Sequence, residues 1–229
     1  MKKDDQRWTR EQAIIAFNLY CKIPFNRVTS SHPELKKRGI VGLANASKLD
    51  EEIWNEFNSN WDDLVFESEK ILSLSEGKDV LEKLPILDEE FHFAEGVEKE
   101  RLVKTRVNQN FFRQAVLSAY DFSCCITGID IPELLVASHI IPWSKASKDR
   151  LNPRNGLCLN ALHDKAFDKG LMTVTPDFKI KISKKILAKP SVPVELWIAS
   201  FEGKDIITPE RFMPTRDFLE YHNKNIFQI

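Results

Sequence analysis

The 229-residue sequence has no long hydrophobic run, little glycine and few cysteines. No apolar stretch approaches the roughly 18 to 20 residues that a membrane-spanning helix needs. The charged start, MKKDDQRWTREQ, lacks the apolar core of a signal peptide. Four cysteines, of which Cys124 and Cys125 are adjacent, do not make a disulfide framework. These absences predict a folded protein of the reducing cytoplasm that has no membrane partner.

Net charge is also small, at −1, and does not by itself indicate a nucleic-acid partner. The distribution is more informative: residues 1–98 carry 13 Lys and Arg against 20 Asp and Glu, whereas residues 99–229 carry 20 against 14. The basic part is where an anionic polymer would be held. Charge alone leaves a second interpretation equally open, in which two solvated surfaces of opposite sign attract each other.

The first third of the chain has the pattern of helices. Thr9 is suited to cap a helix, and apolar residues follow it at helical spacing. The same period recurs in 47–58 and 60–74. The sequence therefore predicts a mostly helical N-terminal domain in residues 1–75.

After this domain the pattern decays into acidic, mixed sequence without repeats, and we interpret residues 76–100 as a linker. Residues 101–229 then mix helices and strands, which predicts an α+β fold class for the whole chain. The expected elements are an amphipathic helix in 106–120, a β-prone run in 134–142, a dense turn in 152–156, a helix in 160–168, a hairpin in 171–182 and a last helix in 209–227.

Three polar side chains of this second domain suggest chemistry: His139 at the end of the β-prone run, Asn155 in the turn and His163 on the short helix. A strand–loop–strand–helix unit can bring all three onto one concave face. Phosphodiester hydrolysis needs a base for the attacking water, a group that holds this base in place, and positive charge on the phosphate and the leaving oxygen. A neutral imidazole suits the first task, a loop-bridging Asn the second, and a divalent ion held by a helix-borne His the third.

Each of these residues also has an ordinary structural interpretation. A single histidine is more often a satisfied structural residue than a catalyst. Asn155 precedes a glycine and suits a turn for that reason alone. His163 would serve equally well as a packed or capping residue. Spacing alone therefore leaves the choice between the two interpretations open.

A resemblance to a known family favours the chemical interpretation. Residues 105–175 closely resemble HNH endonucleases of the ββα-metal fold, in particular their restriction-endonuclease branch. Four blocks carry the likeness in the right order: Cys125-Ile-Thr-Gly128, Ser138-His-Ile-Ile-Pro-Trp143, Asn152-Pro-Arg-Asn-Gly-Leu157 and Leu162-His-Asp-Lys-Ala-Phe-Asp-Lys-Gly170. Near the start, Thr9-Arg-Glu-Gln12 and Lys22-Ile-Pro-Phe25 resemble the extra domain that accompanies this branch.

The resemblance implies that His139 is the general base, Asn155 the loop-organising residue and His163 the metal ligand. Many relatives have Asp or His just before the base as a second ligand, whereas this chain has Ser138, a poor ligand. Some have another helix ligand where this chain has Phe167. The expected ion is therefore held by His163 and, weakly, by Ser138, with water and substrate phosphate completing its shell.

Such an open site suits Mg²⁺, which keeps its water readily, while Mn²⁺ or Ni²⁺ would suit the imidazole better. Asp168 lies about 140° around a helix from His163, so we expect it to support the site without binding the ion. Asp164 is expected to be solvated. No structural zinc is expected, because Cys125 lacks a second cysteine at zinc-finger spacing and Cys158 is distant in the sequence.

Basic residues flank the expected centre, and we predict phosphate contacts from Arg154, Lys165, Lys169 and Lys145. The resemblance implies a metal-dependent endonuclease that cuts double-stranded DNA in restriction or genome defence. Two alternatives stay open: a nonspecific toxin or repair nuclease, and a DNA-binding module whose nuclease centre is inactive. The N-terminal domain would either recognise the target or pair two chains into a homodimer.

Overall fold

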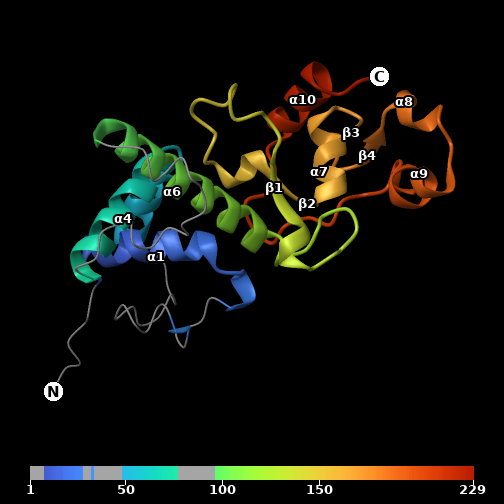
Figure 1. Ribbon diagram of the computed structural model, residues 1–229. Helices are drawn as coiled ribbons and strands as arrows, with labels where there is room; N and C mark the ends of the chain where they lie inside the picture. Colours follow the sequence, from blue (N-terminus) through green and yellow to red (C-terminus); the bar gives the residue numbers. More distant parts are fainter. Residues whose placement is uncertain (1–7, 28–31, 34–47, 77–95) are drawn as a thin grey trace. The chain divides into compact units, whose positions relative to one another are not determined.

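The computed structural model forms two compact units, Met1–Phe111 and Phe112–Ile229, and each is described by itself (Figure 1). The first unit is helical, and the second combines helices with two small antiparallel sheets, which confirms the predicted α+β class. None of the described helices is both long enough and apolar enough to cross a membrane. The residues that the structure describes are 8–27, 32–33, 48–76 and 96–229.

The described elements of the first unit are α1 (Arg10–Lys22), η1 (Phe25–Arg27), α3 (Lys48–Phe57), α4 (Trp61–Glu76) and the first part of α6 (Gly96–Ala119). Thr9 caps α1 as predicted: its hydroxyl accepts from the backbone N–H of Gln12, whose side chain accepts from the Thr9 backbone N–H. The helices predicted in 47–58 and 60–74 are α3 and α4, with their bounds within two residues.

The core of this unit lies where α1 packs on α3 and α4. The buried face of α1 is apolar except for Asn18, whose amide donates to the hydroxyl of Ser68 on α4 at 2.7 Å. Ser68 in turn donates to the Val65 carbonyl. Because buried polar groups are costly unless they are hydrogen-bonded, this pair fixes α1 against α4 at one register.

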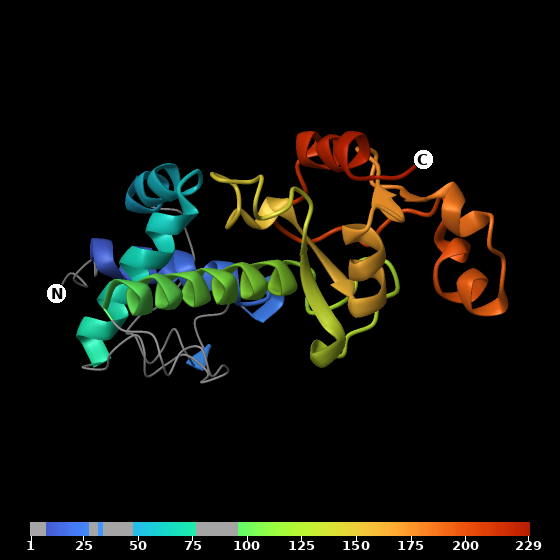
Figure 2. The ribbon, with the colours of Figure 1, turned by 45° about the horizontal axis from the view of Figure 1, so that its top comes forward.

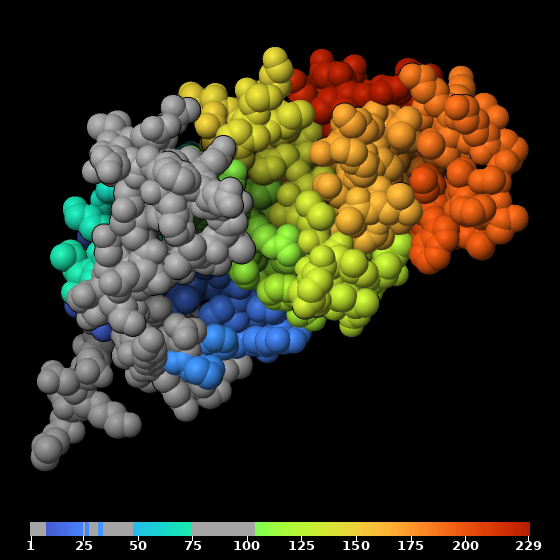
Figure 3. All heavy atoms as spheres, in the orientation of Figure 1, coloured from blue at the N-terminus to red at the C-terminus, as the bar shows by residue number. Residues whose placement is uncertain are grey.

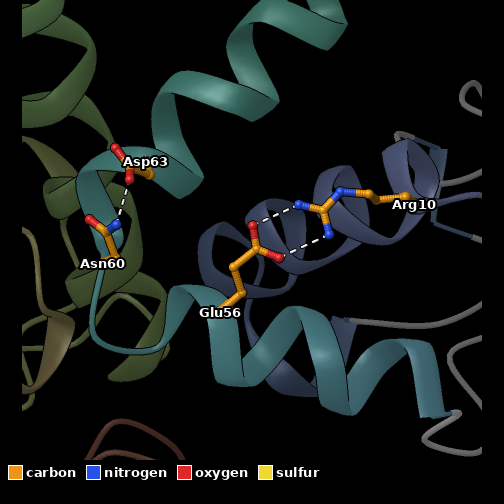
Figure 4. A network of polar contacts seen from close by, with 4 residues as sticks. All are labelled: Arg10, Glu56, Asn60 and Asp63. Carbon is orange, nitrogen blue, oxygen red and sulfur yellow. Dashed lines mark hydrogen bonds and ion pairs between the residues drawn. The ribbon is translucent and has the colours of Figure 1, made fainter.

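Polar contacts at the surface join the same helices (Figure 4). The guanidinium of Arg10 on α1 faces the carboxylate of Glu56 on α3 and donates two hydrogen bonds, at 2.9 and 2.6 Å. Asn60, just before α4, donates to Asp63 in the first turn of that helix. An exposed pair such as Arg10–Glu56 contributes at most about 1 kcal/mol, so the buried contacts hold this unit together.

Helix α6 contributes to both units. Its Asn108 donates to Asp62 at 2.9 Å, and its Phe111 ring lies 6.2 Å from the Trp61 ring, so this part belongs to the first unit. From Phe112 onward the same helix belongs to the second unit. One continuous helix therefore carries the chain from the first unit into the second.

The start of α6 differs from the prediction. The apolar stripe predicts a helix in 106–120, but α6 begins at Gly96, because a charged segment without that stripe continues the same helix. The predicted linker, 76–100, lies mostly outside the described residues. The predicted domain boundary there stays a prediction, whereas the compact units divide inside α6.

The elements of the second unit after α6 are η3 (Pro132–Leu134), β1 (Leu135–His139), η4 (Pro153–Asn155), β2 (Gly156–Asn160), α7 (Ala161–Asp168), β3 (Met172–Val174), β4 (Ile180–Ile182), α8 (Lys184–Leu187), α9 (Val192–Trp197), η5 (Ala199–Phe201) and α10 (Arg216–Asn225). Strands β1 and β2 are antiparallel, with His139 opposite Gly156 and Leu135 opposite Asn160. Strands β3 and β4 form the hairpin predicted in 171–182. The last helix, α10, is shorter than predicted.

Gly156, at the start of β2, lets the second half of α6 approach the first sheet. A Cβ at this position would lie 2.3 Å from Val116 Cγ2 and 3.0 Å from Phe112 Cζ, which is closer than atoms can pack. The absence of a side chain here therefore permits the contact that brings Phe112 next to the end of β1.

Helix α7 follows β2 directly and packs on both strands of the first sheet (Figure 2). It ends as predicted at Gly170, whose φ of 64° favours glycine. A Cβ at Gly170 would lie 2.0 Å from the Ile226 carbonyl oxygen. In both ribbon views α7 lies between the β1–β2 pair and the α8–α9 segment (Figures 1 and 2). This helix therefore has two sides with different neighbours.

Candidate active site

His139, the last residue of β1, is held by two aromatic rings. The Phe112 ring stacks on the imidazole with a centroid distance of 3.8 Å and an interplanar angle of 8°. Trp143 meets it edge-on at 5.6 Å. The imidazole Nε2 lies 2.9 Å from the carbonyl oxygen of Arg150. Because a carbonyl oxygen can only accept, Nε2 carries the proton, and in the neutral ring the lone pair lies on Nδ1.

Electrostatics favour this neutral ring. Burial is the largest effect and lowers the pKa of His139, while the Arg150 carbonyl and the negative charge of Asp164 raise it by less. The net pKa lies below the ordinary value of 6.5. His139 is therefore unprotonated at neutral pH, and its Nδ1 makes no hydrogen bond with any residue that the structure describes.

Asn155 holds the loop that connects β1 to β2, which lies at the surface (yellow in Figure 3). Its side chain is fully buried; Oδ1 accepts from the backbone N–H of Ile141 at 2.8 Å. Its Nδ2 donates to the carbonyls of Ile141 and Asp149, at 3.1 and 3.2 Å. One amide thus ties the two ends of the loop together, and this loop includes the Arg150 carbonyl that orients His139.

Asp164 faces the end of β1 from α7, although it was expected to be solvated. It is partly buried, and burial is the main reason that its pKa is raised. Ser138 and the charges of Lys165 and His139 lower this pKa, whereas the charge of Asp168 raises it. Asp164 therefore lies in the electrostatic neighbourhood of Ser138, His139 and Asp168, and we call these four residues the cluster around His139.

Ser138 and Asp168 complete this cluster from two elements. The Ser138 hydroxyl is buried and lies close enough to Asp164 to lower its pKa, but it makes no hydrogen bond of ordinary geometry within the described part of the chain. Asp168 is exposed and stands four residues after Asp164, on the same side of α7. Ser138 and Asp164 thus lie near His139, and Asp168 lies one helical turn from Asp164.

His163 does not join this cluster, which differs from the expected position of a metal ligand. It is only 1 % exposed, and its Nε2 lies 2.7 Å from the Trp197 carbonyl oxygen, to which it must donate. Its Nδ1 then accepts from the Asn160 amide at 3.1 Å. The Phe201 ring meets the imidazole edge-on at 5.4 Å. Both ring nitrogens are engaged, so neither offers a lone pair to an ion in this arrangement.

A thiol network surrounds His163 on this side of α7. The Cys124 sulfur accepts from the backbone N–H of Asn160 at 3.3 Å. Burial raises the pKa of the Cys124 thiol, but contacts with His163, Thr127 and nearby backbone outweigh it and lower this pKa to about 7. Burial raises the pKa of Cys158 to about 12. All three neighbouring cysteines, including Cys125, are buried free thiols.

The predicted phosphate contacts are exposed side chains of the second unit: Lys145, Arg154, Lys165 and Lys169. Lys165 lies near enough to Asp164 to lower its pKa. The sequence interpretation missed Asp164, although a signal was present. Asp164 and Asp168 are four residues apart and share a helix face, whereas His163 and Asp168 are five apart and do not.

Comparison with known proteins identifies one segment of the chain. The chain matches no protein in a search of curated proteins. Residues 124–175, however, match the family model of the HNH endonuclease. The matched segment runs from the cysteine pair through β1, the loop, β2 and α7 to β3, so it contains the whole cluster around His139. Residues 124–175 therefore match an HNH endonuclease domain, and this domain supports a nuclease activity for the chain.

Proposed function

We propose that the chain is a metal-dependent endonuclease that hydrolyses phosphodiester bonds in double-stranded DNA, with His139 as the general base. The observation that carries the proposal is the state of the His139 ring. The Arg150 carbonyl fixes the proton on Nε2, and burial keeps the ring neutral, so Nδ1 has a lone pair to accept a proton. A water molecule that gives its proton to Nδ1 attacks phosphorus, the bond to the leaving oxygen breaks, and that oxygen takes a proton from solvent.

The proposal places the divalent ion at the cluster on the β1 side of α7. The donors there are the carboxylates of Asp164 and Asp168 and the Ser138 hydroxyl, which is buried without a regular hydrogen bond. Hard ions such as Mg²⁺ prefer oxygen donors and keep part of their water. Among the described residues, no three His, Cys, Asp or Glu side chains form a group suited to a metal. When bound, the ion supplies positive charge at the scissile phosphate and the leaving oxygen.

This proposal moves the metal-binding role from His163 to Asp164 and Asp168. The imidazole of His163 would need to give up its bond with Asn160 or Trp197 to bind an ion. With carboxylate donors, Mg²⁺ or Mn²⁺ is favoured over Ni²⁺, because the argument for Ni²⁺ rested on an imidazole ligand. Asn155 acts indirectly: it holds the loop whose carbonyl orients His139.

The exposed cations of the second unit support DNA as the substrate. Arg154, Lys165, Lys169 and Lys145 would contact phosphates without reading bases. The resemblance of the four sequence blocks to the restriction branch supports a role in restriction or genome defence. Within that role, the N-terminal unit would select the target or pair two chains.

Cleavage of supercoiled plasmid by the purified chain tests the proposal. We expect nicking with Mg²⁺ or Mn²⁺ that EDTA abolishes, and a large loss in His139→Asn and Asp164→Asn. Asp130→Asn, which neutralises an exposed loop carboxylate of the same unit, is the matched control and should cleave normally. A chain that binds DNA but cleaves it with none of these ions would instead be a binding module with an inactive centre.

A further inference from the structure

Arg150 contacts the proposed base through its backbone, and its guanidinium forms no ion pair with a described residue. It belongs to the loop between β1 and β2, and its carbonyl accepts the Nε2 proton of His139. Its guanidinium lies over the Trp143 ring, 5.2 Å from the centroid. Since Trp143 also meets His139 edge-on, one indole braces both side chains. The same indole therefore contacts both the cation and the imidazole.

The hydrogen-bonding capacity of this guanidinium is not used within the unit. Arg150 forms no ion pair with a described residue, and its Nε is buried without a hydrogen-bond partner. The adjacent Asp149 carboxylate is engaged by the Asn152 amide at 3.1 Å. Arg113 shows the ordinary structural use of arginine in this unit, because its guanidinium donates to the carbonyls of Leu135 and Pro132.

A partly buried cation that has no anion nearby is unfavourable unless a ligand supplies the negative charge. The guanidinium lies over the Trp143 ring, and a planar fork of this kind matches two oxygens of a phosphate. Because Trp143 contacts both this guanidinium and His139, the phosphate that it would bind lies near the water that the base activates.

We propose that Arg150 binds the scissile phosphate of the DNA substrate through its guanidinium fork, with Trp143 as the residue that positions it. The inference rests on the proposed nuclease function and adds a second source of positive charge at the reacting group. Negative charge develops on the nonbridging oxygens as the water attacks phosphorus. A fixed cation next to these oxygens therefore stabilises the transition state more than the substrate.

Three matched variants separate phosphate binding from a purely structural role. Arg150→Met keeps an unbranched side chain over Trp143 but has no charge, and Arg150→Lys keeps the charge but not the fork. Lys148→Met removes an equal charge from an exposed position of the same loop. The backbone carbonyl that orients His139 is present in all three.

Single-turnover cleavage of a DNA duplex at saturating enzyme with Mg²⁺ is the first readout. We expect Arg150→Met to lose about 10² to 10³ in rate, Arg150→Lys to recover part of it, and Lys148→Met to stay within a few-fold of wild type. Arg150→Met or Arg150→Lys at the wild-type rate would overturn the proposal. If Arg150→Met fails to fold, the folded Arg150→Lys variant decides by the same criterion.

DNA binding in EDTA over a range of salt concentrations is the second readout, and it does not depend on cleavage. The logarithm of the binding constant falls linearly with the logarithm of the salt concentration. Loss of one phosphate contact in Arg150→Met should make this slope less steep by about 1. An inactive wild type would defeat the proposed function. In that case an unchanged slope would also overturn the role of Arg150, whereas a reduced slope would support it.

Discussion

His139 and His163 lie on two sides of α7 in similar surroundings, but they differ in how many of their ring nitrogens are engaged in hydrogen bonds. His139, on the β1 side, and His163, on the α9 side, each donate Nε2–H to a backbone carbonyl, of Arg150 and Trp197 respectively. The difference lies at the other nitrogen. Nδ1 of His163 accepts from Asn160, while Nδ1 of His139 has no hydrogen bond within the described residues. A buried histidine with an oriented ring is therefore reactive only if its second nitrogen is unoccupied.

The charges around α7 follow the same division. The β1 side gathers the carboxylates of Asp164 and Asp168 and the unpaired guanidinium of Arg150. The α9 side instead has a hydrogen-bonded network of Cys124, Asn160 and His163. Charged side chains that lack partners in the protein are typical of a ligand-binding site. A network in which each polar group has a hydrogen-bond partner is typical of a protein core.

The largest effect is expected at His139. His139→Ala removes the proposed base, and loss of a general base typically costs about 10² to 10⁴ in rate. Single-turnover cleavage measures the loss, and DNA binding in EDTA should stay close to wild type because no phosphate contact is removed. Activity within a few-fold of wild type would remove His139 from the mechanism and erase the contrast between the two sides of α7.

His163→Gln should affect stability instead of chemistry. The change disturbs a buried ring with two hydrogen bonds, and we expect a loss of roughly 2 to 4 kcal/mol in the free energy of unfolding. Urea denaturation measures this loss. At a temperature where the variant is folded, cleavage should stay within a few-fold of wild type, and a folded but inactive variant would contradict the structural role of His163.

The pH dependence of cleavage sharpens the comparison further. Because burial lowers the pKa of His139 below 6.5, the ring takes up its second proton at a lower pH than a free imidazole does. We expect kcat/KM to fall as pH falls, by up to about tenfold per pH unit, with the midpoint of this acid limb below pH 6.5. A pH–rate profile of wild type tests this, and an acid limb centred above pH 7 would show that the ring is not held in a neutral state.

Removal of the N-terminal unit should change the chemistry least. A fragment that begins near Glu98 keeps most of α6 and the whole cluster around His139. We expect it to fold, to nick plasmid at a rate within about tenfold of the full chain, and to bind DNA with a steep salt dependence. It should lose target preference or paired cutting of both strands. Circular dichroism and a nicking assay test this, and an unfolded fragment would show that the two units need each other.

Much of the fold follows from local patterns in the sequence. The Thr9 cap, the helices α3 and α4 and the hairpin of β3 and β4 each depend on residues that are close in the chain, so their spacing predicts them. Gly170 ends α7 as expected, since only glycine adopts its backbone conformation easily. The position of His139 at a strand end was predicted in the same way.

The orientation of side chains on α7 was not predictable from those patterns. His163 and Asp164 are adjacent and point about 100° apart, so a shift of one residue exchanges the two sides of the helix. What separates them is distant in the sequence: the Trp197 carbonyl engages His163, and the end of β1 receives Asp164. Tertiary contacts, not spacing, therefore decide which residue faces the base.

Calorimetric titration with Mn²⁺ tests the central claim most directly, which is that the reactive side of α7 faces β1. The full-length wild type is compared with Asp164→Asn and His163→Gln, and Asp130→Asn serves as the control. We predict that Asp164→Asn weakens Mn²⁺ binding at least about tenfold, in the range found when metal-site residues are lost, while His163→Gln binds nearly as wild type. Loss of binding in folded His163→Gln together with full binding in Asp164→Asn would contradict the account.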